Sequence, residues 1–131
     1  MFGMFEPPSE KPSMYSPLTL AYIGDAVYEV YVRAYLLRNG NLPTNRLHKE
    51  SIKFVSAEAQ SSFMEKLEPL LTEEEEAIYK RGRNAKSYTV PKHAQLIDYK
   101  RATGFEALIG YLYLCKNQER IDELMKTIFT I

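Results

Sequence analysis

Residues 18–37 read LTLAYIGDAVYEVYVRAYLL, a run that is apolar on nearly every side when it is drawn as a helix. Ser16 suits the N-cap of such a helix, and Pro17 suits its first position. A helix that is apolar all round is typically buried, and three charges within the run argue against a membrane span. This stretch therefore predicts the central helix of a globular domain.

The three charges are Asp25, Glu29 and Arg33, spaced four residues apart and so aligned in one stripe of the helix. Glu29 and Arg33 fit an ordinary ion pair along a helix surface. Asp25 stands between Gly24 and Ala26, whose small size lets another backbone come close. A buried, unpaired carboxylate is energetically costly, so Asp25 requires either a partner or a function.

A second apolar run, FEALIGYLYLC at residues 105–115, contains Glu106 as its only charge. Two apolar helices with one isolated acid each predict that Asp25 and Glu106 face a shared site. Such a site would either hold a divalent cation or divide the roles of general acid and general base. Mg²⁺ prefers oxygen ligands of this kind and keeps several waters.

The chain has 131 residues, which is the size of one domain. Its 17 basic and 17 acidic residues cancel, so any footprint for nucleic acid must be local. A single cysteine excludes an internal disulfide. The first residues lack the basic and apolar regions of a signal peptide, so we expect a cytoplasmic location and no membrane association.

The remaining sequence shows helical spacing and no β-alternation, so the predicted fold class is all-α, a helical bundle. Residues 1–15 contain three prolines and predict an extended N-terminal arm. Residues 16–131 predict the single folded domain, which closes with a short helix over residues 121–128.

Local signals predict where several of these helices begin and end. A helical region over residues 46–67 has a break signal at Ser56. Thr72 starts the next helix with a capping box, and Gly82 is its expected stop. Pro91 is expected to open the long helix region that carries the second apolar run.

Between Ala77 and Ile97 the sequence has no acidic residue. Basic side chains interleaved with tyrosines form a good phosphate-contact surface, although a solubilising loop that balances the four glutamates at 73–76 is the alternative. The candidate RNA contacts in this stretch are Lys80, Arg81, Arg83, Lys86, Tyr88, Lys92 and His93. A second, weaker basic patch contains Arg46 and Lys49.

The segments around both acids resemble the ribonuclease III family. Residues 20–27, LAYIGDAV, resemble its signature helix, and residues 105–110, FEALIG, resemble its second motif. The resemblance is to the mini-ribonuclease III branch, the bacterial form without a separate domain for binding double-stranded RNA, and residues 79–87, YKRGRNAKS, also match that branch. It implies an endonuclease domain that forms a two-fold homodimer.

The resemblance further implies Mg²⁺-dependent cleavage of double-stranded RNA, with Mn²⁺ as a substitute, and products that carry a 5′-phosphate and a 3′-hydroxyl. Asp25 and Glu106 match the essential acids of the family and are implied to be catalytic residues and metal ligands. The implied substrate is a stem of the precursor of 23S ribosomal RNA. Whether a ribosomal protein presents this RNA stays open.

Three other acids of the family pattern are missing, at Ala21, at Thr103 and in the loop at residues 43–45. We therefore expect fewer protein ligands and more waters on the metal. Asp98, about two turns before Glu106, is a candidate substitute ligand, but a surface position suits it better.

Two other functions are open at this point. A ribonuclease III-like fold without catalysis, acting as an RNA-binding or ribosome-assembly module, would explain the missing acids. An all-α metal hydrolase of small nucleotides would need clustered acids that face one site, and the glutamates at 73–76 lack that setting.

Overall fold

The computed structural model describes residues 11–86 and 95–129, in which all regular structure is helical, and this confirms the all-α fold class. None of the described helices has the length and apolarity needed to cross a membrane. In chain order the elements are the 3₁₀ turn η1 (Pro12–Met14), α1 (Pro17–Leu37), α2 (Thr44–Val55), α3 (Ala57–Leu67), the 3₁₀ turn η2 (Glu68–Leu70), α4 (Glu73–Arg83), α5 (Leu96–Leu114) and α6 (Gln118–Ile128).

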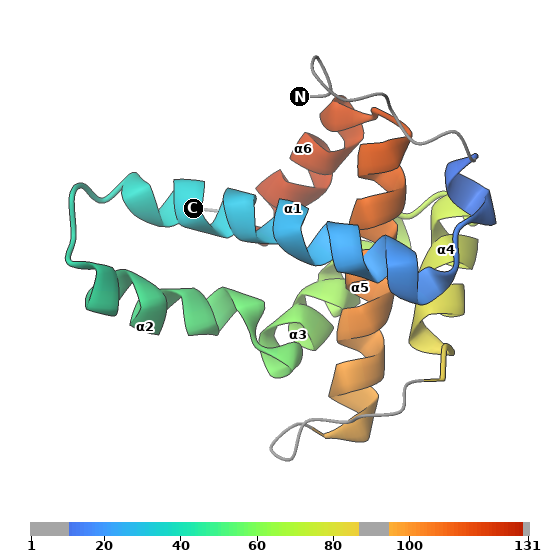
Figure 1. Ribbon diagram of the computed structural model, residues 1–131, viewed down its shortest axis with the longest axis horizontal. Coiled ribbons are helices and arrows are strands. Elements are labelled where there is room, and N and C mark those ends of the chain that lie inside the picture. Colours follow the sequence, from blue (N-terminus) through green and yellow to red (C-terminus); the bar gives the residue numbers. More distant parts are fainter. Residues whose placement is uncertain (1–10, 87–94, 130–131) are drawn as a thin grey trace.

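The helix α5 is the one around which the others pack (Figure 1). α1 crosses it at a steep angle, and α3, α4 and α6 also contact it. Beyond the crossing, α1 and α2 extend together to one side as a hairpin. The chain thus brings the two apolar runs predicted from sequence, α1 and α5, into direct contact.

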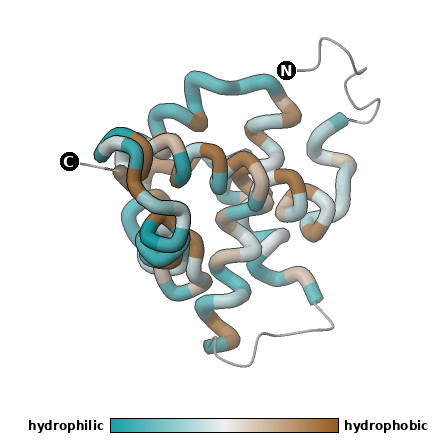
Figure 2. The backbone as a smooth tube through the Cα atoms, turned by 60° about the vertical axis from the view of Figure 1, so that its left-hand side comes forward, coloured by the Kyte–Doolittle hydropathy of each residue, from teal (hydrophilic) through white to brown (hydrophobic). Residues whose placement is uncertain are grey.

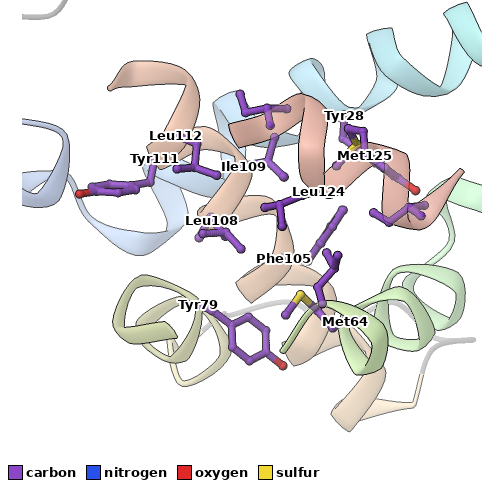
Figure 3. Packing of buried hydrophobic residues seen from close by; sticks show 14 of the residues in the cluster. Tyr28, Met64, Tyr79, Phe105, Leu108, Ile109, Tyr111, Leu112, Leu124 and Met125 are labelled. Atoms are coloured by element: carbon purple, nitrogen blue, oxygen red, sulfur yellow. The ribbon is translucent and has the colours of Figure 1, made fainter. Parts of the chain in front are cut away.

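The core lies between α1, α3, α4, α5 and α6 and is built from large side chains (Figure 3). The rings of Tyr28 and Phe105 meet edge to face with their centroids 4.9 Å apart. Met64 and Leu124 are also fully buried in this cluster. Each such side chain contributes about 1.5–3 kcal/mol when it leaves water, so the packing holds α1 and α5 in a fixed relation.

α1 is buried along one stripe only. The opposite side carries Tyr22, which is 83% exposed, and Val30, which is 63% exposed. The expectation that this helix is buried on all sides is therefore wrong for the single chain. Figure 2 shows hydrophobic and hydrophilic positions mixed along the helices. The buried stripe consists of Leu20, Ala21, Gly24, Tyr28, Val32 and Leu36.

Two predicted helix boundaries are confirmed. Ser56 has extended backbone angles, φ −64° and ψ 154°, and separates α2 from α3. At the start of α4 the Thr72 hydroxyl accepts from the Glu75 N–H at 3.2 Å, and the Glu75 carboxylate accepts from the Thr72 N–H at 3.0 Å. Both halves of the capping box are thus formed.

Two other predicted boundaries are wrong. Gly82 lies inside α4, where a Cβ atom would come within 2.8 Å of the Gly104 Cα. Close packing of α4 on α5 therefore explains this glycine, rather than a helix stop. α5 begins only at Leu96 because Gln95 is extended, so Pro91, itself outside the described residues, does not open that helix.

The last residues of the expected N-terminal arm are attached to α4, while residues 1–10 lie outside the described range. The Arg81 guanidinium donates to the backbone carbonyls of Ser13 and Tyr15 at 3.1 and 3.2 Å. This contact joins segments that are far apart in sequence.

Candidate active site

Asp25 and Glu106 lie where α1 crosses α5, and glycines on both helices make that crossing possible. A Cβ atom on Gly24 would lie 1.8 Å from the carbonyl oxygen of Glu106, and one on Gly110 would lie 1.9 Å from that of Leu20. The expectation that Gly24 admits another backbone is confirmed, and this backbone is α5 of the same chain. Backbone contact therefore fixes the spacing of the two acids.

The carboxyl groups of Asp25 and Glu106 are close enough to share a hydrogen bond. Asp25 is exposed, so its expected burial is wrong, whereas Glu106 is half-buried. Burial, followed by the hydrogen bond and the charge of Asp25, raises the pKa of Glu106 from 4.5 to about 8. The two acids thus lie together, an arrangement that favours a proton or a cation between them.

Gln60 of α3 is a third polar side chain at this site, and it was missed from sequence. It is only 2% exposed, and its amide Nε2 lies 3.0 Å from the Val55 carbonyl and 3.4 Å from Glu106 Oε2. Its spacing from Met64 and Leu67 places it on the buried face of α3. That spacing could have indicated burial, but not which helix this face meets.

The positions of the missing family acids supply no charge to the site. Ala21 is buried one turn before Asp25. The Thr103 hydroxyl donates to a backbone carbonyl one turn earlier in α5, and the Asn45 side chain accepts from the next backbone N–H. None of these three positions therefore contributes a carboxylate to the site.

Asp98 stands apart from the pair, whereas Glu29 lies one turn from Asp25 and its charge adds to the raised pKa of Glu106. Asp98 is in the first turn of α5, about 12 Å along the axis from Glu106, which favours its interpretation as a surface acid. Glu29 and Arg33 form the expected ion pair at 3.2 Å, with side chains that are 41% and 66% exposed. Exposed pairs of this kind contribute about 0–1 kcal/mol.

The donor set fits a hydrated divalent cation. Among residues 11–86 and 95–129, no three His, Cys, Asp or Glu side chains gather into a metal-binding group. Asp25 and Glu106 offer only hard oxygen ligands, and Mg²⁺ is commonly held by one or two carboxylates with water completing its shell. Burial and the neighbouring carboxylate of Asp25 raise the pKa of Glu106, and a bound cation would offset both effects.

Three of the four glutamates at the start of α4 contact other side chains of the fold. Glu75 binds the Arg120 guanidinium at 2.8 Å in addition to forming the capping box. Glu76 pairs with Lys80 at 2.9 Å. Glu74 accepts from the Tyr111 hydroxyl. These three acids thus have structural partners, which removes the clustered-acid basis for a hydrolase of small nucleotides.

The basic candidates of the acid-free stretch have different surroundings. Lys80 pairs with Glu76, and Arg81 holds the N-terminal segment. The Arg83 guanidinium lies over the Tyr79 ring, 5.8 Å from its centroid, and Lys86 is exposed. The remaining candidates, Tyr88, Lys92 and His93, lie outside the described residues.

Two further basic surfaces are present. Arg46 and Lys49 are exposed on α2, in the projecting hairpin. Arg83 also lines a groove with Lys100 and Arg101, between the end of α4 and the start of α5, although Glu68 in this groove pairs with Arg101 at 3.9 Å. Lys100 and Arg101 were missed because an acid, Asp98, separates them from the acid-free stretch.

The raised pKa of Glu106 predicts a pH-dependent stability. Between its ordinary pKa of 4.5 and its folded pKa of about 8, Glu106 binds more proton in the folded chain than in the unfolded chain, so stability falls as pH rises. In EDTA, the free energy of unfolding of wild type should fall by on the order of a few kcal/mol across this window. That of Glu106→Gln should not show this fall. Urea unfolding of both proteins at several pH values checks this, and parallel curves would contradict it.

Comparison with known proteins identifies relatives over most of the chain. A ribonuclease III domain matches residues 18–117. The protein named Mini-ribonuclease 3 from Clostridium tetani is 50% identical over 117 residues, covering 88% of this chain and 78% of that protein. Its namesake from Brevibacillus brevis is 49% identical over 120 residues, covering 92% and 90%. A crystal structure of a Fusobacterium nucleatum protein superposes with a TM-score of 0.85 at 35% identity, covering 94% of this chain and all of that one.

Proposed function

Because this chain belongs to the ribonuclease III family and is an endoribonuclease, we propose that it cleaves double-stranded RNA with Mg²⁺ held by Asp25 and Glu106. The observation that carries the proposal is the contact between one acid of α1 and one acid of α5. Both carboxylates are hard ligands, so Mn²⁺ is proposed to replace Mg²⁺.

The site's own residues define what each group does. Glu106 must give up its proton before it can act as a ligand, and Asp25, which is exposed, presents its carboxylate toward the approaching phosphate backbone. When bound, the cation supplies an activated water and neutralises charge on the phosphate oxygens. Attack by water with the 3′ oxygen as leaving group gives a 5′-phosphate and a 3′-hydroxyl.

The substitutions at Ala21 and Thr103 are compatible with this activity, because water can complete the shell of a Mg²⁺ ion held by two carboxylates. A module without catalytic function is disfavoured, since it would have no use for two mutually repelling acids at one crossing. Relatives of similar length that carry the name Mini-ribonuclease 3 also support an enzyme.

We further propose a two-fold homodimer formed through the uncovered side of α1. A shallow apolar hollow lies along this side and reaches α5 and α6. Apolar faces of this kind mark interaction surfaces, and a second copy would cover it with the same surface. The lining side chains include Ile23, Ala26, Val27, Val30, Ala34 and Tyr113.

Val30→Glu should convert the proposed dimer to a monomer at micromolar concentration, because it places a charge in the centre of an apolar contact. Ile52→Glu is the matched control, since Ile52 is 60% exposed on α2 and Val30 is 63% exposed on α1. Light scattering measures the mass of each variant. An active wild-type monomer, or a Val30→Glu protein that stays dimeric, would contradict the proposal.

We propose that Arg83, Lys86 and the neighbouring Lys100 contact RNA phosphates, with Arg46 and Lys49 on α2 as a second surface. Duplex RNA is recognised largely by its shape, phosphates and 2′-hydroxyls, which exposed cations suit. The remaining proposed contacts from the acid-free stretch are Lys80, Arg81, Tyr88, Lys92 and His93.

The combined change Arg83→Ala and Lys86→Ala should weaken duplex binding and reduce the salt slope by about two units, because each phosphate contact contributes about one. Lys126→Ala removes one charge from another surface, a hollow between α6 and α1 that Tyr31 and Tyr35 also line, and should leave the slope unchanged. Binding titrations across salt concentrations measure the slopes. Coincident slopes for wild type and the double variant would exclude this surface.

The proposed substrate is a stem of the precursor of 23S ribosomal RNA, cleaved in the cytoplasm. The test compares Mg²⁺ with EDTA on this stem, on an unrelated duplex, on single strands and on nucleoside triphosphates. Cleavage of duplexes alone, and only with Mg²⁺, supports the function. Adding ribosomal proteins to the stem tests for a presenting partner, whereas hydrolysis of triphosphates would overturn the substrate class.

A further inference from the structure

Gln60 is buried although its burial leaves one polar atom without a partner. The side chain is 2% exposed, and within the described part of the chain its Oε1 is buried and accepts no hydrogen bond. An unsatisfied buried acceptor costs about 1–3 kcal/mol. An apolar residue on the same face of α3 would avoid that cost, so the amide requires another explanation.

The orientation of the amide is fixed by its neighbours. Its Nε2 faces two oxygens, the Val55 carbonyl at 3.0 Å and Glu106 Oε2 at 3.4 Å. Rotating the amide by half a turn would place its oxygen against both of them. The donor end of Gln60 therefore faces the acid, and the unpartnered oxygen is the cost of placing a donor there.

The segment that carries Gln60 is the junction between α2 and α3, and it is tied to α1. Ser56 interrupts the chain between α2 and α3, and its hydroxyl accepts from the Ala59 N–H at 3.1 Å to cap α3. The Phe54 carbonyl, next to that of Val55, accepts from the Tyr28 hydroxyl of α1 at 2.8 Å. This elbow presents the Gln60 amide to Glu106 from a rigid support, as a group that orients a ligand requires.

We propose that Gln60 is a positioning residue for Glu106, holding one carboxylate oxygen so that the group faces Asp25 and the divalent cation. The inference rests on the cation site of the proposed function. Residues that orient metal ligands in this way typically change metal affinity by about 10–100-fold when they are replaced. Gln60 would thus supply a fixed ligand geometry in a site that has few protein ligands.

The test is calorimetric titration of the full chain with Mn²⁺ in the absence of RNA. Gln60→Met keeps length and volume but removes the donor, and should weaken Mn²⁺ binding about tenfold or more. Its melting temperature in EDTA should change little, because loss of the unpartnered oxygen offsets loss of the hydrogen bond to the Val55 carbonyl. Ser61→Ala is the matched control, since Ser61 is also 2% exposed on α3.

Tyr28→Phe separates positioning from a merely structural role. It removes the other tie of the elbow, the bond to the Phe54 carbonyl, and leaves the amide of Gln60 in place, so Mn²⁺ affinity should be retained. An equal loss in Tyr28→Phe and Gln60→Met would overturn the positioning role. Wild-type affinity in a folded Gln60→Met protein would overturn it as well, while leaving the cation site intact.

A nuclear magnetic resonance experiment on wild type covers the case in which Gln60→Met does not fold. The Gln60 side-chain amide signal should shift on Mg²⁺ addition with the midpoint of cation binding, and should not do so in Glu106→Gln. If Mg²⁺ binds but the Gln60 signal does not shift, the positioning role is overturned and the proposed metal site stands. Absence of any cation binding to wild type would overturn both the inference and the proposed metal site.

Discussion

Asp25→Asn and Glu106→Gln should each reduce duplex RNA cleavage by about a thousandfold or more, while folding and RNA binding are retained. Each change removes one of the two carboxylates that meet at the α1–α5 crossing. A catalytic cation contributes several kcal/mol to the transition state, and each 1.36 kcal/mol corresponds to about a tenfold rate. Single-turnover cleavage at saturating Mg²⁺ measures the loss.

Asp98→Asn is the control for these two variants. Asp98 shares α5 with Glu106 but lies about two turns away from it, so this change removes an acid from the same helix without altering the pair. The variant should keep most of the wild-type rate. Appreciable activity in Asp25→Asn or Glu106→Gln, with circular dichroism showing a folded protein, would remove that acid from the catalytic site.

Gly24→Ala should destabilise the protein by about 3 kcal/mol or more and prevent folding in a marginal background. The added Cβ would stand 1.8 Å from the Glu106 carbonyl oxygen and 2.8 Å from the Gly110 nitrogen, so backbone rather than a flexible side chain must move. Helix propensity alone predicts stabilisation of about 1 kcal/mol for this change. Urea unfolding therefore tests the crossing by the sign of the effect.

Gly40→Ala provides the comparison for Gly24→Ala. Gly40 has φ +102° and no heavy atom within 4 Å of a Cβ placed there, so only backbone strain opposes alanine, at about 1–2 kcal/mol. A Gly24→Ala protein as stable as wild type would show that α1 and α5 do not cross in backbone contact. If Gly24→Ala lowers the free energy of unfolding no more than Gly40→Ala does, the two helices can move apart at little energetic cost.

That Asp25 and Glu106 would meet was predictable in part, because each acid interrupts an apolar helix segment. Burial in an apolar run makes a carboxylate costly, so its presence is informative without knowledge of the fold. Helix capping was equally local: Thr72 and Glu75 satisfy each other within one turn. Such signals depend only on neighbours in sequence, so they can be identified from one sequence without the fold.

The contribution of Gln60 and the contacts of Arg81 could not be predicted in this way. Gln60 meets Glu106 across 46 positions of sequence, and Arg81 meets Ser13 across 68. Contacts over such separations produce no periodic pattern in the sequence, because tertiary packing alone decides which helices face each other. For the same reason, the exposed side of α1 could not be predicted. The composition of the helix shows that it carries apolar surface, but not which part of the molecule covers that surface.

The central claim, that Asp25 and Glu106 together hold the catalytic cation, is tested most directly by anomalous X-ray diffraction from crystals grown with Mn²⁺. The account predicts an anomalous peak between the two carboxylates, with the remaining ligands supplied by water, and no peak there in Asp25→Asn crystals. A strong peak elsewhere in the chain, with none between Asp25 and Glu106, would contradict it.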